Sequence, residues 1–181
     1  MSNFKTQKAL KLKPETLAKQ VFEGEELQNI LDFVQFLRAN GMKPKLAAFN
    51  AWEVVVSKQN ANYTNNQILR RLRIDPEQKT WSVNLHYFAK YADHIIDETV
   101  INFVWCNLYN KRCNRSAKNP DCNCRAIKSM MIFSKTFDNM CCNEQIRITN
   151  PSAKELEYIK ELVSVAKNIV ENKVATRQLD L

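Results

Sequence analysis

Glycine and histidine are scarce in this chain of 181 residues, which contains two of each. Gly24 and Gly41 are too few to build a glycine-rich loop around a phosphate, so neither a P-loop nor a dinucleotide-binding fold fits the sequence. His86 and His94 do not have the spacing of a zinc protease motif, and no G-x-S-x-G turn is present. The common nucleotide-binding and hydrolytic signatures are therefore missing.

Long apolar runs are also missing, because no stretch approaches the roughly 18 residues that a membrane span requires. The lysine-rich start lacks the apolar stretch of a signal peptide. The hydrophobic fraction of 45% and the charged fraction of 25% are ordinary for a globular protein. We therefore expect a cytoplasmic protein without a membrane segment, with a single domain over residues 1–181 and a flexible basic arm at residues 1–13.

Residue periodicity predicts the main elements. Apolar residues at helical spacing predict a helix over about residues 25–40, and an alternating pattern over residues 49–88 predicts a three-stranded antiparallel meander. Asp97 and Glu98 suit a first helical turn, so a helix is favoured over a strand for residues 97–108. A strand pair is expected near residues 127–133 and 145–149.

The end of the chain carries the clearest helix signal. Ser152 precedes Glu155 in the S-x-x-E capping arrangement, and an apolar stripe follows as far as Lys173. We expect the last eight residues to fray. The predicted fold class is α+β, in which an antiparallel sheet packs with N-terminal, central and C-terminal helices.

All six cysteines lie between positions 106 and 142. In reducing surroundings, grouped cysteines are typical of metal binding or redox chemistry, and zinc requires four ligands at tetrahedral corners. The quartet best placed for a structural zinc ion is Cys113, Cys122, Cys124 and Cys141. Cys142 is a reserve ligand, and Cys106 follows Trp105 on an apparently buried element. Two alternatives stay open, namely reduced cysteines with no shared role and a thiol switch or disulfide.

The formal net charge of +8 is concentrated on the same segment. Residues 111–128 carry six lysines and arginines against Asp121 alone, so this basic loop is a candidate site for phosphate or nucleic acid. Arginines of the predicted meander extend the patch. The candidate anion-binding residues are Arg70, Arg71, Arg112, Arg115 and Arg125. The alternative interpretation is a solvated cationic loop.

Two strings carry a family resemblance, "IFSKTFDNMC" at residues 132–141 and "NPSAKELEYIKELV" at residues 150–163. They resemble a family of small cysteine-rich proteins of anaerobic Gram-positive bacteria, in which an I-F-G-K-x-F-D-x-V-C segment precedes an Asn-Pro helix start. The likeness covers the second half of the chain and implies the same grouped cysteines, but it implies no activity. Ser134 stands where that pattern prefers glycine and the Pro-Gly turn is missing, so the resemblance leaves the shape of the cysteine loop open.

These observations favour a non-enzymatic binding or regulatory domain whose cysteine loop is held by structural zinc. Trp52 and Trp81 are candidates to line a small-ligand pocket with His86 at its rim, and the alternative is that both tryptophans belong to the core. A nucleic-acid-associated protein that uses the basic loop is a second hypothesis. A thiol redox sensor is the third, and it requires an accessible cysteine with a lowered pKa.

Overall fold

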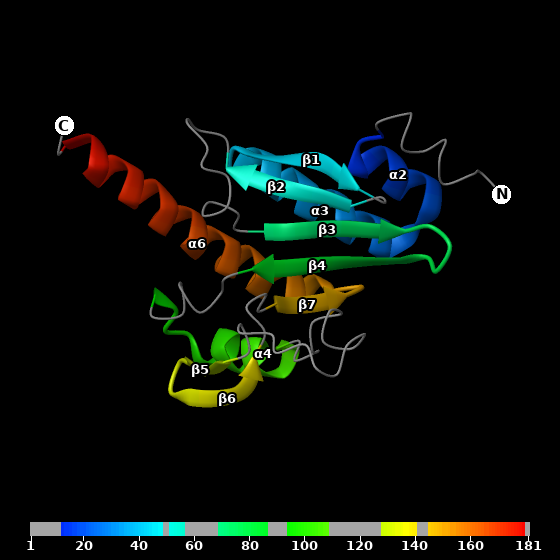
Figure 1. Cartoon of the computed structure of the whole chain (residues 1–181). Coiled ribbons are helices and arrows are strands. Elements are labelled where there is room, and N and C mark those ends of the chain that lie inside the picture. Colours follow the sequence, from blue (N-terminus) through cyan, green and yellow to red (C-terminus); the bar gives the residue numbers. More distant parts are fainter. Residues whose placement is uncertain are drawn as a thin grey trace, which may run out of the picture.

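The computed structural model describes residues 12–48, 51–56, 69–86, 94–108, 128–140 and 145–179 (Figure 1). Its helices are α2 (Pro14–Val21), α3 (Gly24–Ala39), α4 (Glu98–Asn107) and α6 (Ala153–Leu179). Its strands are β1 (Met42–Ala48), β2 (Ala51–Val56), β3 (Leu69–Asp75), β4 (Thr80–His86), β5 (Lys128–Ile132), β6 (Lys135–Met140) and β7 (Gln145–Thr149). The fold is α+β, as the sequence predicts.

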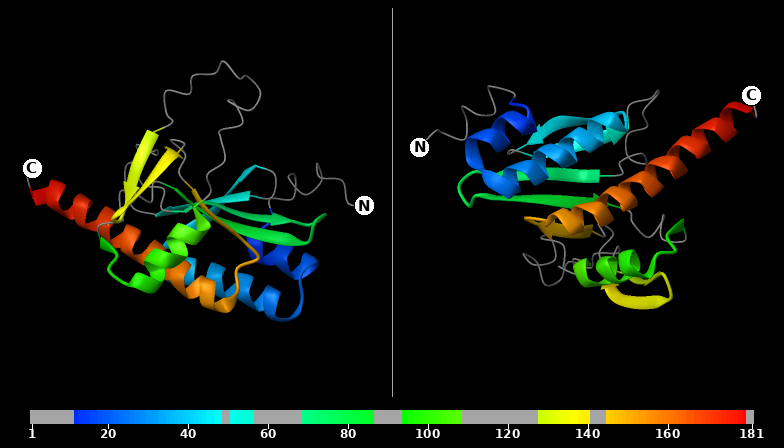
Figure 2. Two further views of the ribbon diagram at one scale, coloured as in Figure 1. Left: turned by 90° about the horizontal axis from the view of Figure 1, so that it is seen from below. Right: turned by 180° about the vertical axis from the view of Figure 1, so that it is seen from behind.

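Five strands form one antiparallel sheet in the order β1-β2-β3-β4-β7, and β5 and β6 form a separate hairpin. Helices α2, α3 and α6 all lie on one side of the five-stranded sheet (Figure 2). We call the side that faces these helices the inner face and the opposite side the outer face. The hairpin and α4 lie beyond β7 (Figure 1), and the hairpin rises on the side of the outer face (Figure 2).

The core lies between the inner face and the helices. Strand residues alternate between the two faces, so each of the central strands sends every second side chain into this layer. Trp81 and Phe33 of α3 meet there, with ring centroids 6.4 Å apart. The largest fully buried side chains are Trp52, Trp81, Phe33, Leu17, Ile30, Leu37, Met42, Leu72, Ile74 and Ile132.

Several predicted elements are confirmed. Helix α3 matches the helix expected over residues 25–40, and β2, β3 and β4 form the expected antiparallel meander. The central helix is α4, whose N-cap Asp97 accepts a hydrogen bond of 2.7 Å from the backbone N–H of Thr99. Hydrogen bonds from the hydroxyl and backbone of Thr99 hold the pKa of Asp97 below its ordinary value.

The two strands expected near residues 127–133 and 145–149 are present as β5 and β7, but their expected pairing with each other is wrong. Strand β5 pairs with β6, which the sequence analysis did not predict, and β7 pairs with β4 in the main sheet. A two-residue turn explains the difference, because Ile132 pairs with Lys135 and Phe133 takes a left-handed backbone with φ of 55°. The chain therefore reverses locally at Phe133 instead of running on to residue 145.

Helix α6 begins as predicted but continues further. Ser152 and Glu155 form the capping box, in which the Glu155 carboxylate accepts from the Ser152 N–H at 2.8 Å. The helix runs to Leu179, past the predicted end at Lys173, and no proline or glycine interrupts it. Within the described ranges, no helix combines the length and the apolar character needed to cross a membrane.

Candidate functional site

On the outer face, polar side chains gather on three neighbouring strands of the sheet, β3, β4 and β7. Ser82 of β4 pairs in register with Arg73 of β3 on one side and with Thr149 of β7 on the other. This row of three residues crosses the sheet. Ser82 is 5% exposed and is the one buried polar side chain among the residues whose burial is described. The row brings one guanidinium and two hydroxyl groups together across three strands, so it is a candidate binding site.

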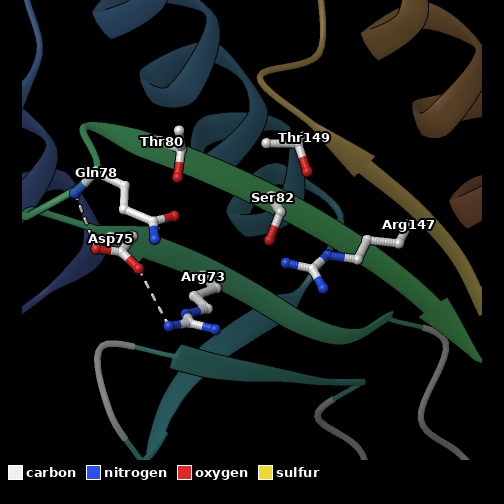
Figure 3. Close-up of a pocket in the computed structure, with 7 residues that line it drawn as sticks. All are labelled: Arg73, Asp75, Gln78, Thr80, Ser82, Arg147 and Thr149. Carbon is white, nitrogen blue, oxygen red and sulfur yellow. Dashed lines mark hydrogen bonds and ion pairs between the residues drawn. The ribbon is translucent and has the colours of Figure 1, made fainter.

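A polar hollow of about 270 Å³ lies over this row (Figure 3). Side chains from three strands and from the turn between β3 and β4 surround it. They are Arg73, Asp75, Gln78, Thr80, Ser82, Arg147 and Thr149. Among the described residues, the lining consists of two arginines, an aspartate, a glutamine and three residues with hydroxyl groups. These side chains offer a ligand hydrogen bonds and charge.

Asp75 is the acidic member of the lining, and its carboxylate is engaged within the protein. Asp75 Oδ1 accepts from the backbone N–H groups of Glu77 and Gln78, each at 3.2 Å, which builds the turn after β3. Asp75 Oδ2 accepts from Arg73 Nη2 at 3.2 Å. The carboxylate therefore orients the Arg73 guanidinium beside the hollow (Figure 3).

Arg147 approaches the hollow from the opposite side. It lies on β7, pairs in register with Asn84 of β4, and extends toward Ser82 (Figure 3). Two guanidinium groups therefore stand near the hydroxyls of Thr80, Ser82 and Thr149. Guanidinium groups bind oxyanions through planar, charge-assisted hydrogen bonds, and hydroxyls can add further donors. The donor set suits an anion that carries several oxygens.

Arg71 continues the basic character along β3. Arg71 is half-buried and pairs in register with Asn84. This pair lies two residues along the strands from the pair of Arg73 and Ser82. The Nε atom of Arg71 is buried and has no hydrogen-bond partner within the described part of the chain. Arg71 therefore adds positive charge to the outer face, two residues along β3 from Arg73.

The predicted zinc ligands lie outside the described residues, as do three of the predicted anion-binding arginines. These residues are Cys113, Cys122, Cys124, Cys141, Arg112, Arg115 and Arg125. Cys106 is described, on α4, and is an exposed free thiol, whereas the sequence analysis set it on a buried element. The described ranges contain no group of three or more side chains suited to hold a metal ion.

The predicted small-ligand residues are not brought together. Trp52 and Trp81 are 2% and 1% exposed and belong to the core below the inner face. His86 is the last residue of β4 and has the same strand parity as Ser82, opposite to that of Trp81. The burial supports the interpretation that both tryptophans are core residues.

The two predicted anion-binding arginines of the meander, Arg70 and Arg71, occupy different positions on β3. Arg71 pairs in register with Asn84, two residues along β3 from Arg73, while Arg70 is the extra residue at the irregularity of β3, where the pairing shifts between Leu69 and Arg71. Ser82, Arg147 and Thr149 are not among the residues that the sequence predicted for a site. Alternation within each strand places them on the polar face, but only the register of β4 against β7 reveals that they are neighbours.

Comparisons of the chain with protein-family models, with curated proteins and with solved structures find no match. The resemblance to cysteine-rich proteins of anaerobic Gram-positive bacteria stays a prediction.

Proposed function

We propose that this protein is a non-enzymatic binding domain that holds an oxyanion, such as a phosphate group, on the outer face of its sheet. The observation that carries the proposal is the row of Arg73, Ser82 and Thr149, with Arg147 extended toward it. The two guanidinium groups supply positive charge, and the hydroxyls supply orientation. The carboxylate of Asp75 accepts a hydrogen bond from Arg73 and holds its guanidinium in place. The positive charge of Arg73 therefore offsets the repulsion between this carboxylate and an anionic ligand.

Titration with inorganic phosphate and pyrophosphate, followed by calorimetry, tests this proposal. Arg147→Gln is expected to weaken binding by about ten- to a hundredfold, since a hydrogen bond to a charged group contributes about 1.5–3 kcal/mol. Thr149→Val keeps the shape of the side chain and removes the hydroxyl, so a smaller loss is expected.

Lys19→Gln is the matched control. Lys19 is exposed on α2, on the helical side of the sheet, and its replacement changes the net charge by the same amount as Arg147→Gln. The control is expected to bind phosphate like the unaltered protein. Equal affinity of all these variants for phosphate would contradict the proposal.

We also propose that the cysteine segment binds one structural zinc ion through Cys113, Cys122, Cys124 and Cys141. The support is the clustering of six cysteines between positions 106 and 142 beside a concentration of cations that favours thiolates. Metal analysis of the purified protein, with thiols counted before and after denaturation, is expected to give one zinc and four shielded thiols. Six titratable thiols without zinc would contradict the proposal, and an oxidisable pair without zinc would favour the thiol sensor.

A further inference from the structure

Positive charge on the outer face extends well beyond the hollow. Strand β1 is the far edge of the sheet, and its exposed Lys43 and Lys45 alternate with Met42, Pro44 and Leu46. Met42 is buried in the core and Leu46 packs against it, so the two lysines belong to the outer face. The cations of this face therefore come from β1, β3 and β7.

The spacing of these strands sets the size of the surface. Neighbouring strands lie about 4.8 Å apart, so the four steps from β1 to β7 span roughly 19 Å. Two lysines of β1 stand at one edge of this span and Arg147 of β7 stands at the other. Arg71 and Arg73 of β3 lie at its middle. One phosphate group in the hollow does not reach Lys43 or Lys45. A ligand that engages the whole surface must carry several anionic groups in succession.

We infer that the outer face binds single-stranded nucleic acid through its phosphates, with one phosphate in the hollow and its neighbours on Arg71, Lys43 and Lys45. This inference rests on the proposed function of the hollow. A single strand is favoured over a duplex because its flexible backbone can place successive phosphates across a surface roughly 19 Å wide, whereas a duplex is stiff over lengths of about 150 base pairs.

The composition of the surface determines the mode of recognition. Sequence-specific recognition of single strands requires contacts to the bases, which commonly stack on exposed aromatic side chains while their edges accept or donate hydrogen bonds. On the outer face, the side chains described on β3, β4 and β7 are charged or polar and include no aromatic ring. The protein therefore contacts the backbone and discriminates little between base sequences.

Fluorescence anisotropy with a labelled twelve-residue oligothymidine at increasing salt is the test, together with calorimetry with inorganic phosphate. Each neutralised phosphate of a single strand contributes about −0.7 to the slope of log K against log salt concentration. Three to five contacts therefore predict a slope between about −2 and −3.5. An oligoadenosine of the same length is expected to bind with affinity within about threefold, because contacts to phosphates do not read bases.

The double variant Lys43→Gln and Lys45→Gln separates the surface from the hollow. It is expected to weaken oligonucleotide binding about tenfold and to reduce the slope by about 1.4, while inorganic phosphate binds as before. Arg71→Gln gives an independent variant at the middle of the surface. The control is Lys19→Gln with Lys154→Gln, which removes the same charge from exposed positions on α2 and α6 and is expected to leave both ligands unaffected.

The possible failures are distinguishable. Phosphate binding that depends on Arg147, with no effect of the outer-face variants on the oligonucleotide, would overturn the inference and leave the proposed function intact. If the Lys43→Gln and Lys45→Gln double variant and Arg71→Gln bound the oligonucleotide as tightly as the unaltered protein, the binding would belong to another part of the chain, such as residues 111–128. If the control variant weakened oligonucleotide binding equally, the attraction would be to net charge alone and the inference would be overturned. If Arg147→Gln and Arg73→Gln both left phosphate binding unchanged, both proposals would be overturned.

Discussion

Asn150, which follows β7, binds both backbone groups of Trp81 near the start of β4. Its Oδ1 accepts from the N–H of Trp81 at 2.8 Å, and its own N–H donates to the carbonyl of Trp81 at 2.8 Å. The backbone of Asn150 is left-handed, with φ of 48°. Asparagine tolerates this conformation better than most residues, so one side chain meets both requirements.

Asn150→Ala is expected to lower the free energy of unfolding by about 2 kcal/mol, because it removes the bond to Trp81 and strains the backbone. Asn150→Gly removes the bond but accepts the left-handed conformation, so about half that loss is expected. Urea unfolding of both variants measures the difference. A larger loss for glycine than for alanine would contradict the argument.

Glu15 and Arg38 link α2 to α3 by an ion pair in which Arg38 Nε donates to Glu15 Oε1 at 2.6 Å. Burial raises the pKa of Glu15, but the hydrogen bond and the charge of Arg38, helped by a backbone hydrogen bond and by Lys13, lower it by more. The net pKa lies below the ordinary value. The unfolded chain therefore binds a proton more readily, and the pair stabilises the fold above the ordinary carboxyl pKa of about 4.3.

Glu15→Gln is expected to lower the free energy of unfolding at pH 7 by less than about 1 kcal/mol, because the Arg38 side chain is 43% exposed and solvent screens the pair. The difference from the unaltered protein should shrink as the pH falls from about 4.5 through the lower folded pKa. Urea unfolding over a pH series measures it. Glu77→Gln, at an exposed position of the turn, is the control, and a difference that grows at low pH would refute the sign.

At the scale of elements, the β5–β6 hairpin depends on α4. A two-stranded sheet is marginal by itself. Trp105 of α4 donates from Nε1 to the carbonyl of Ile132 at 3.2 Å, and its ring meets that of Phe133 edge-on at 6.1 Å. Lys135 Nζ lies 5.2 Å from the centroid of the indole. One side chain thus attaches both strands of the hairpin to the helix.

Trp105→Ala is expected to speed amide hydrogen exchange in β5 and β6 by about tenfold or more, equivalent to ~1.4 kcal/mol, with the central strands β3 and β4 unchanged. Trp105→Phe keeps a ring and loses the hydrogen bond, so an intermediate effect is expected. Exchange followed by mass spectrometry resolves the segments. Uniform acceleration across the molecule would instead show that the hairpin and the main sheet open together.

Elements differed in how well the sequence predicted them, and β1 shows why. Amphipathic periodicity predicted α3 and the meander, since each buries one face. The run Lys43, Pro44, Lys45 lacks that signal, and proline and lysine are typical of an edge strand, where they block pairing with other chains. No strand was therefore predicted over residues 42–48, because an edge strand does not need the regular apolar alternation of a central strand. Strand β6 was missed for a related reason, because its half-exposed Phe137 stands among polar residues.

At the scale of the whole molecule, Trp81 fills the layer between the sheet and α3. Its side chain is 1% exposed, and its Nε1 atom is buried without a hydrogen-bond partner in the part of the chain that the structure describes. The indole therefore contributes through packing, while its N–H contributes an unfavourable desolvation.

Trp81→Ala is expected to lower the free energy of unfolding by about 3–5 kcal/mol, because it leaves a large cavity in the core. Trp81→Phe leaves a smaller cavity and removes the unpaired N–H, so less than half of that loss is expected. Thermal and urea unfolding provide the measurement. Similar losses for phenylalanine and alanine would show that the N–H has a partner on which the core depends.

The candidate site was predictable only in part. Arg71 was predicted to bind anions because arginines cluster on a predicted strand, whereas Ser82 and Thr149 are unremarkable polar residues until their strands are paired. The tryptophans attracted a ligand hypothesis because large aromatic rings occur in pockets as well as in cores. Their burial depends on the helices that cover the inner face, which residue types alone do not specify.

Local properties of the sequence determined the helices, the central strands and their polar and apolar faces, because periodicity and capping act over a few neighbouring residues. Only the tertiary structure decided that β7 joins β4, since strand pairing depends on contacts between residues far apart in the chain. That pairing places Thr149 beside Ser82 and extends Arg147 toward it, and so it creates the hollow on which the proposed function rests.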